Sequence, residues 1–410
     1  MRIASIFSYI YFFAWIFLSF LPYVYYSTKV YVALLTFLSI SAVAYTFYLI
    51  GNYKLIPFFK CLFVFVGFLS IYGLWHWIAG ERLFWIGGDF FVEKNRYLMW
   101  LSISMLSVVP VYIFTCRGVL NDFRMKILFF FMFAASIFAF HVTYQQMLLE
   151  ATILGTKQEE FTITVVYFFL SILPLIFLFK KHVFLQFVLI SIFFFFFIMS
   201  AKRGVILLGS ICIIFMIWGI LSNFSVKKKM LFFFLSLFFL VGLFKFTMIQ
   251  MENSPYLMMR YEDTLEGNTS QRDVFIAVIL DYIDKNFSIK NFFFGIGAQE
   301  TLSVNYSFAH NDWIAILLEQ GFLGLLSYLI FWIGFIYTWI KSWKYKNSFV
   351  VIGSLVVIGF GKTMFSMFYL PVVEGMIISS GFFSIVLGYY LGITFPQYSS
   401  DEIRAINSCN

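Results

Sequence analysis

The chain has 410 residues, of which 62% are hydrophobic and only 12% are charged, whereas soluble globular domains carry about 25% charged residues. This composition excludes a soluble globular domain and predicts an integral membrane protein. The net charge of +8 would also fit nucleic-acid binding, but the distribution of the charges argues against that class.

Long apolar stretches recur from the first residues to the last. A bilayer core is crossed by about 20 apolar residues, and helices satisfy the backbone polar groups there. Ten stretches of at least 18 residues lack Asp, Glu, Lys and Arg: 3–28, 30–53, 61–80, 97–116, 127–149, 161–179, 182–201, 204–226, 320–340 and 375–400. Two more, 230–251 and 347–373, are each interrupted by one lysine that could reach the membrane surface, Lys245 and Lys362. We therefore predict an all-α polytopic protein with about twelve transmembrane helices.

Positive charges are unevenly shared between the two sides of this predicted membrane domain. If successive helices alternate in direction, fifteen of the 28 Lys and Arg residues lie on the side of the N-terminus, and eleven lie opposite, spread over much more sequence. Because positively charged loops favour the cytoplasm, both termini are predicted to be cytoplasmic. The basic excess is thus explained by topology, and we expect no nucleic-acid partner. No pair of cysteines falls on the opposite side, so no disulfide framework is predicted.

Three regions follow from this topology. Residues 1–251 are predicted to hold the first nine transmembrane helices, and residues 252–311 a helical extracytoplasmic loop. Residues 312–410 are predicted to hold the last three helices and a cytoplasmic tail. A loop of about 60 residues exceeds what a connection needs, and loops of that length are usually functional or disordered.

The sequence Ser-Ala-Lys-Arg-Gly at 200–204 joins two predicted spans with almost no loop. Lys202 and Arg203 are expected at the outer membrane surface, and Gly204 would permit a tight turn. An arginine fixed there can bind a phosphate or pyrophosphate through two donors. The alternative interpretation is a pair of cations that extend to the surface without a ligand.

The long loop contains one clear helix signal. Ser270 is a candidate N-cap, which places Arg272 in the first turn of a helix whose apolar residues on most faces predict packing against the membrane domain. Arg260 precedes it in a more polar stretch. Gly-Ile-Gly at 295–297 predicts a turn where a ligand could approach the backbone, although a lone pair of glycines is a weak signal.

The loop leads into the stretch 307–324, SFAHNDWIAILLEQGFLG, in which polar residues give way to a membrane helix. Asn311 or Asp312 is expected to cap that helix, which holds His310 at the membrane surface. Gly321 and Gly324 have the spacing that lets a second helix approach closely. The simplest interpretation of the stretch is a helix cap followed by a packing motif.

Glu319 is a further candidate on the same helix, because an acidic residue within a membrane is a functional candidate by default. Nine residues of continuous helix would separate Glu319 from His310 by about 13 Å along the axis. Glu319 is therefore not expected to orient His310 directly unless the helix breaks.

No metal site or cofactor is predicted. The four histidines, His76, His141, His182 and His310, lie in different segments and on different sides of the membrane. The sequence has neither a P-loop nor the paired aspartates that hold a divalent cation on a nucleotide diphosphate.

Three pieces of the sequence together resemble the O-antigen polymerase and O-antigen ligase superfamily: SAKRG, the arginine-led helix ending in FFFGIGAQE, and AHNDWIAILLEQGFLG. The resemblance extends over roughly residues 200–328. It implies a fold similar to that of the lipid-dependent (GT-C type) glycosyltransferases and a location in the bacterial inner membrane. It also implies a metal-independent reaction on undecaprenyl-pyrophosphate-linked glycans, with the active site facing the periplasm.

The resemblance also assigns roles to individual residues. Arg203 and Arg272 match the arginines assigned to the donor pyrophosphate, with Arg260 as an added candidate. His310 matches the histidine assigned to the acceptor hydroxyl. The remaining residues of the motif are expected to support the site: Asn311, Glu319, Gly321 and Gly324. These roles are chemically sound, because guanidinium groups stabilise a leaving pyrophosphate and a neutral histidine can accept the hydroxyl proton.

The form HNDW, with one histidine, is closer to the polymerases. We therefore expect an enzyme that polymerises lipid-linked repeat units into O-antigen or a related surface polysaccharide, with a chain-length regulator as a candidate protein partner. One alternative is the O-antigen ligase, which transfers polymer to lipid A-core. Another is a lipid-linked oligosaccharide flippase, but a flippase should carry charges distributed through its spans, where this chain has little beyond Lys245, Lys362 and Glu319.

Overall fold

The computed structural model describes most of the chain: residues 2–24, 28–78, 97–154, 163–200, 202–222, 272–297, 300–305, 309–365, 368–369 and 374–397, with isolated residues between 225 and 262. Throughout these ranges the regular structure is helical and no strand occurs, which confirms the predicted all-α class.

The helices before the long loop follow the predicted spans. They are α1 (Arg2–Val24), α2 (Thr28–Asn52), α3 (Pro57–Ile78), α4 (Tyr97–Leu101), the π-helical turn η2 (Ser102–Leu106), α5 (Val108–Cys116), α6 (Asp122–Leu154), α7 (Val166–Ile172), the 3₁₀ segment η4 (Leu173–Phe179), α8 (Val183–Met199) and α9 (Arg203–Ser222). The change from α7 to η4 coincides with Pro174, which has no backbone N–H to continue an α-helix.

The second half holds three short helices and three long ones. The short ones are α12 (Arg272–Asn286), α13 (Ile289–Phe294) and α14 (Thr301–Asn305), and the long ones are α15 (Asp312–Lys341), α16 (Lys346–Phe365) and α17 (Glu374–Thr394), with the 3₁₀ turn η5 (Ser342–Lys344) between α15 and α16. The described part of the long loop therefore holds three short helices. The expected cap Ser270 lies outside the described residues.

Within the described ranges, nine segments are long and apolar enough to cross a membrane. Two shorter apolar helices, at 166–179 and 183–199, occupy further predicted spans. The predicted span at 230–251 falls mostly outside the described residues. The molecule is thus a polytopic membrane protein by length and composition of its helices.

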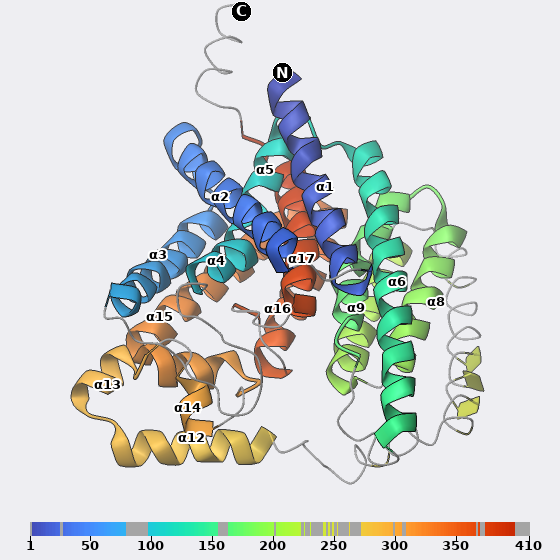
Figure 1. The fold of residues 1–410 in the computed structure, drawn as a ribbon. Helices are drawn as coiled ribbons and strands as arrows, with labels where there is room; N and C mark the ends of the chain where they lie inside the picture. Colours follow the sequence, from blue (N-terminus) through green and yellow to red (C-terminus); the bar gives the residue numbers. More distant parts are fainter. Residues whose placement is uncertain are drawn as a thin grey trace, which may run out of the picture.

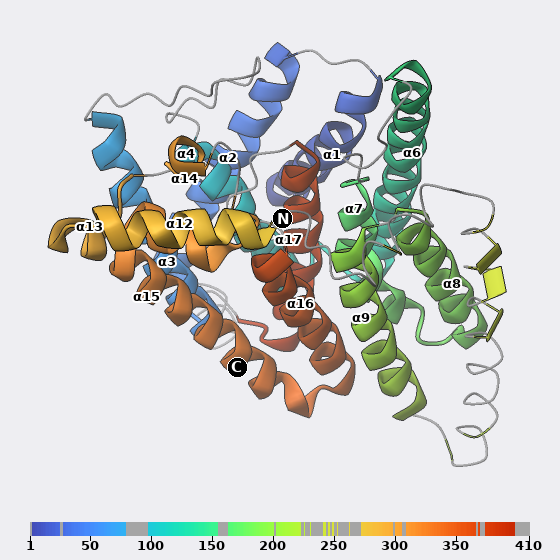
Figure 2. The ribbon, with the colours of Figure 1, turned by 90° about the horizontal axis from the view of Figure 1, so that it is seen from below.

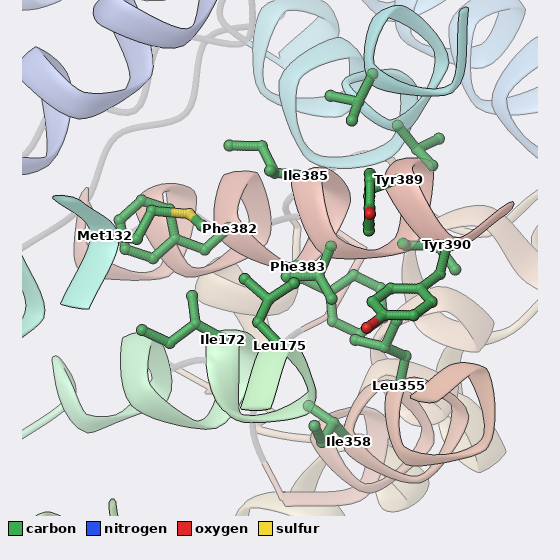
Figure 3. Close-up of a cluster of buried hydrophobic side chains, with 14 of the residues drawn as sticks. Met132, Ile172, Leu175, Leu355, Ile358, Phe382, Phe383, Ile385, Tyr389 and Tyr390 are labelled. Atoms are coloured by element: carbon green, nitrogen blue, oxygen red, sulfur yellow. The ribbon is translucent and has the colours of Figure 1, made fainter. Parts of the chain in front are cut away.

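Helix α17 forms the centre of the bundle, because 94% of its apolar stretch Ile377–Thr394 is buried. Figure 3 shows side chains of α6, α7, η4 and α16 gathered around it, among them Met132, Ile172, Leu175 and Ile358. Three glycines of α17 allow helices α5 and α1 to pack closely against it. An added Cβ would lie 2.6 Å from the Val108 carbonyl oxygen at Gly388 and 2.5 Å from Thr115 Cβ at Gly392, and at Gly381 it would overlap the Trp15 ring.

The short helices of the long loop lie together at one end of the bundle, opposite the N-terminus of α1 (Figure 1). Helix α12 runs across this end, and the view along the bundle shows it lengthwise (Figure 2). A small hydrophobic cluster fixes α12 to the start of α15 and consists of Ile279, Ala309, Ala315 and Leu318. In α12 only Ile279 is fully buried, so the helix packs against α15 along one face although its sequence is apolar on most faces.

Candidate active site

The site is centred on His310, a half-buried residue that lies two positions before the first residue of α15. Burial, together with the positive charges of Arg272 and Lys202, lowers the pKa of the His310 imidazole from 6.5 to about 4. Coulomb interactions weaken with distance, so both cations must lie near this ring. Three segments that are far apart in the sequence therefore meet at one histidine.

Both neighbours of His310 in the chain are fixed. Ala309 is buried in the cluster that joins α12 to α15. Asn311 caps α15, as predicted, because its side-chain oxygen accepts hydrogen bonds from the backbone N–H groups of Trp313 (3.0 Å) and Ile314 (3.2 Å). His310 itself has a φ of 50°, a left-handed conformation that is uncommon for residues other than glycine. The ring is thus held between two anchored residues.

Asp312 is not the cap but a buried acceptor. Its Oδ2 atom accepts hydrogen bonds from the Tyr328 hydroxyl (2.9 Å) and from the backbone N–H groups of Phe368 (3.0 Å) and Tyr369 (3.3 Å). A buried carboxylate needs such donors. This carboxylate ties the start of α15 to the non-helical residues between α16 and α17.

Lys202 shares an aromatic ring with a second lysine. The ammonium groups of Lys202 and Lys362 lie over the ring of Tyr167, at 5.1 and 5.3 Å from its centroid, within the range of cation–π interactions. Lys362 is only 1% exposed and donates a long hydrogen bond to Ser379 Oγ (3.4 Å). Lys362 therefore does not reach the membrane surface, which the sequence had left open, because this side chain is enclosed by α7 and α17.

The two matched arginines begin helices. Arg203 is the first residue of α9 and Arg272 the first of α12, and Arg203 directly follows Lys202. Between α8 and α9, the Lys202 N–H donates a hydrogen bond to Ser200 Oγ at 3.2 Å. Gly204 lies within α9 and does not make the turn, contrary to the prediction. Arg260 lies outside the described residues.

Glu319 is a buried anchor on α15. Its Oε1 atom accepts a hydrogen bond from Thr301 Oγ1 (2.6 Å) and its Oε2 atom one from the Tyr369 hydroxyl (3.3 Å). The Tyr72 hydroxyl donates to its backbone carbonyl. Helix α15 is unbroken from Asp312 to Glu319, and through these contacts Glu319 links α14 and α3 to α15.

The helix does break two residues later. Gly321 has φ 68° and ψ −164°, which divides α15 into two helical segments. An added Cβ there would lie 2.5 Å from the Gly295 nitrogen, and one at Gly324 would meet Gln320 of the same helix. The Phe293 backbone carbon, at the end of α13, lies equally close to an added Cβ at Gly321 (2.5 Å), so a second helix and the turn after it approach α15 here, whereas Gly324 contacts its own helix.

That turn is Gly-Ile-Gly at 295–297. The backbone N–H groups of Ile296 and Gly297 donate to the carbonyls of Leu318 and Glu319, both at 3.0 Å. These bonds satisfy carbonyls that the break in α15 leaves without helical partners. The close approach predicted at this turn therefore exists, but the approaching group is the backbone of α15 and not a ligand.

No protein-family model matches the chain, and no curated protein matches it. The chemistry of the site must therefore be read from its own residues. A histidine with a pKa of about 4 is neutral at pH 7 and can accept a proton. Lys202, Arg203 and Arg272 supply positive charge from two other segments, which suits a phosphate or pyrophosphate group.

The sequence did not indicate that two lysines, Lys202 and Lys362, lie over one aromatic ring near the site. From the sequence, Lys202 is expected only to lie at the membrane surface beside Arg203, and Lys362 could reach that surface. Their shared partner, Tyr167, lies in an apolar stretch without any polar signal. Only the folded arrangement of α7, α9 and α16 brings these three side chains together.

Proposed function

We propose that this protein is a metal-independent glycosyltransferase that polymerises polyprenyl-pyrophosphate-linked oligosaccharide repeat units. The observation that carries the proposal is a half-buried His310 near Arg272 and Lys202, and burial first, then these two charges, lowers its pKa. A neutral base can accept the acceptor hydroxyl proton, and nearby cations can stabilise a leaving pyrophosphate.

In the proposed reaction, the acceptor hydroxyl attacks the anomeric carbon of the donor sugar. A new carbon–oxygen bond forms, and the bond from this carbon to the pyrophosphate oxygen breaks with its electron pair. His310 takes the hydroxyl proton. Arg203, Arg272 and Lys202 stabilise the charge that develops on the leaving pyrophosphate. Arg260, which lies outside the described residues, remains a candidate for the same role.

The wider setting of the enzyme belongs to the same proposal. We infer a GT-C type fold with about twelve transmembrane helices, located in the bacterial inner membrane with both termini in the cytoplasm. The end of the bundle that carries α12 to α14 would then face the periplasm, where undecaprenyl-pyrophosphate-linked glycans serve as donor and acceptor and a chain-length regulator can bind. Asn311, Glu319 and Gly321 would act as positioning residues, because each fixes the start or the break of α15.

The decisive experiment replaces His310 by Asn, which tolerates left-handed backbone conformations but cannot act as a base near pH 7. We expect surface polysaccharide to fall from a ladder to core plus one repeat unit, at unchanged protein abundance. His182→Asn makes the same chemical change at an exposed position at the start of α8 and should leave the ladder intact.

Two other outcomes would count against a polymerase. If long chains accumulate on the carrier lipid while the core stays bare, the protein is a ligase. If the ladder is unchanged in His310→Asn, the site is not catalytic, and the stretch serves only as a cap and a packing element.

The role of the arginines is tested separately. Because a guanidinium presents paired donors that an ammonium lacks, Arg203→Lys and Arg272→Lys should lose most of the activity, as the alanine variants should. Arg124→Lys, at the start of α6 near the other end of the bundle, is the matched control. Full activity in both lysine variants would reduce the arginines to a general electrostatic role.

A further inference from the structure

Helix α13 and the first residue after the break in α15 present a continuous apolar surface. Ile289 is 82% exposed, and Phe292, Phe293, Phe294 and Phe322 are between 41% and 49% exposed. The rings of Phe292 and Phe322 are stacked with centroids 5.8 Å apart and an interplanar angle of 8°. We call these five residues the α13 patch.

The α13 patch continues an apolar stripe along the membrane helix. Beyond Phe322, the exposed apolar residues of α15 recur every three or four positions, which is one face of a helix: Leu326, Leu329, Ile333, Tyr337 and Ile340. In a membrane-spanning helix such an exposed stripe contacts lipid. The patch therefore extends the lipid-facing surface of α15 onto a helix of the loop.

The position of the patch along α15 gives its depth. The charged end of this helix is marked by Lys341, and about 20 residues, at 1.5 Å each, cross a hydrocarbon core of about 30 Å. Counting back from Lys341 places the opposite boundary of the core near Gly321. A tilted helix needs more residues to cross the core, which moves this boundary towards the N-terminus of α15. Phe322 therefore lies at the boundary or inside the hydrocarbon core.

Backbone contacts hold α13 at that depth. The 295–297 turn donates hydrogen bonds to the carbonyls of Leu318 and Glu319. In addition, the backbone of Gly295 is in close contact with that of Gly321. The helix is also closed internally: Ser288 Oγ accepts from the Asn291 N–H (3.2 Å) and the Gly295 N–H donates to the Asn291 carbonyl (2.7 Å). The backbone N–H groups of Asn291, Gly295, Ile296 and Gly297 are thus all paired within the protein.

Helix α12, unlike α13, carries exposed charges of both signs beside exposed apolar residues such as Val274 and Leu280. Asp281 and Lys285 form an ion pair on α12 with side chains 60% and 66% exposed, as in water. Four residues after Lys285 the chain reaches Ile289. Within α13, Lys290 follows Ile289 and is also exposed, so the apolar surface is formed by Ile289 and the phenylalanines, while the Lys290 side chain can extend its ammonium group to water.

We propose that the α13 patch inserts into the lipid leaflet on the side of the long loop, where acyl chains of membrane phospholipids cover it. Helix α13 is then an interfacial anchor and not a span. Through the 295–297 turn, the anchor fixes the loop helices at a constant height above the bilayer. The inference is independent of the reaction proposed for His310.

Nitroxide labels test this proposal in lipid nanodiscs. Single cysteines replace Ile289, Phe294, Lys285 or Ile333 in a chain whose four native cysteines have been substituted, and power saturation measures the access of oxygen and of a water-soluble nickel chelate. We expect labels at Ile289 and Phe294 to favour oxygen over nickel, as the label on the α15 stripe at Ile333 should. The label at Lys285 should favour nickel.

Two results would overturn the proposal. Preferential access of nickel at Ile289 and Phe294 would place α13 in water. Shielding from both reagents would show that protein covers the patch, for instance a second copy of the chain. A photo-crosslinking residue at Ile289 in the otherwise native chain provides a second test, since it should acquire the mass of a phospholipid, and absence of any lipid adduct contradicts insertion.

Discussion

The low pKa of His310 can be tested without knowledge of the substrate. The difference between 6.5 and about 4 corresponds to about 3 kcal/mol against the charged imidazole, at 1.36 kcal/mol per unit. At pH 5, roughly one-tenth of His310 should be protonated, whereas nearly all of an unperturbed histidine would be. The sign matters for function, because a lowered pKa keeps the base neutral as the pH falls from 6.5 towards 4.

Replacing Arg272 by Gln should raise this pKa. Burial is the largest cause of the shift and remains in the variant, while one of the two neighbouring charges is removed. The midpoint should therefore rise above 4 but stay below 6.5. Lys285→Gln is the matched control, because it removes the same charge from the same helix about 20 Å further along the axis.

The midpoint can be measured by NMR of ring-labelled histidine in detergent or nanodiscs between pH 3.5 and 8, with the His310 resonance assigned by its loss in His310→Asn. A wild-type midpoint near 6.5 would refute the burial of the imidazole beside two cations. An equal shift in Arg272→Gln and Lys285→Gln would refute the proximity of Arg272, since a general loss of charge would then explain both.

Three further predictions concern the helix break at Gly321, the cap at Asn311 and the membrane topology. Gly321→Ala should destabilise the protein by about 2–4 kcal/mol, from left-handed backbone strain and overlap with the 295–297 turn, whereas Gly67→Ala, with nothing within 4 Å, should not lower the thermal unfolding temperature; equal losses would contradict the account of the break. Asn311→Ala should cost about 1 kcal/mol in the same assay, the value of a lost cap, and no loss would show that the cap is dispensable. With an impermeant thiol reagent on intact cells, a cysteine at Ser303 should react and one at Lys344 should not, and the reverse pattern would invert the topology.

Local features of the site could be predicted from the sequence. The cap at Asn311 depends on three consecutive residues and on the start of an apolar run, and Arg272 at the beginning of a helix depends on a similar local signal. The all-α class followed from the length of the apolar stretches. The joining of His310 to Arg272 and Lys202 required more than local signals, and the sequence pointed to it only through the resemblance of three separate motifs.

Features that depend on distant partners could not be predicted. Gly321 and Gly324 have the spacing of a helix-packing motif, but spacing does not indicate that Gly321 takes a positive φ against the 295–297 turn. Close packing by small residues also occurs on α17, where Gly388 and Gly392 are four residues apart, against three for Gly321 and Gly324. The burial of Lys362 depends on contacts with α7 and α17, which are distant in the sequence. The local sequence around Lys362 therefore could not show that this lysine is enclosed.

The two supports of α15 differ in when their partners are synthesised. The break at Gly321 is stabilised by residues 295–297, which precede it in the chain and are available as soon as α15 leaves the ribosome. The Asp312 carboxylate accepts hydrogen bonds from the backbone of Phe368 and Tyr369, which are synthesised only after the whole of α16. During biogenesis, α15 can therefore adopt its bent shape first, and its buried carboxylate acquires its two backbone donors only after α16 has been made. Truncation before Phe368 should leave a bent helix in which Asp312 keeps only the Tyr328 hydroxyl as a donor.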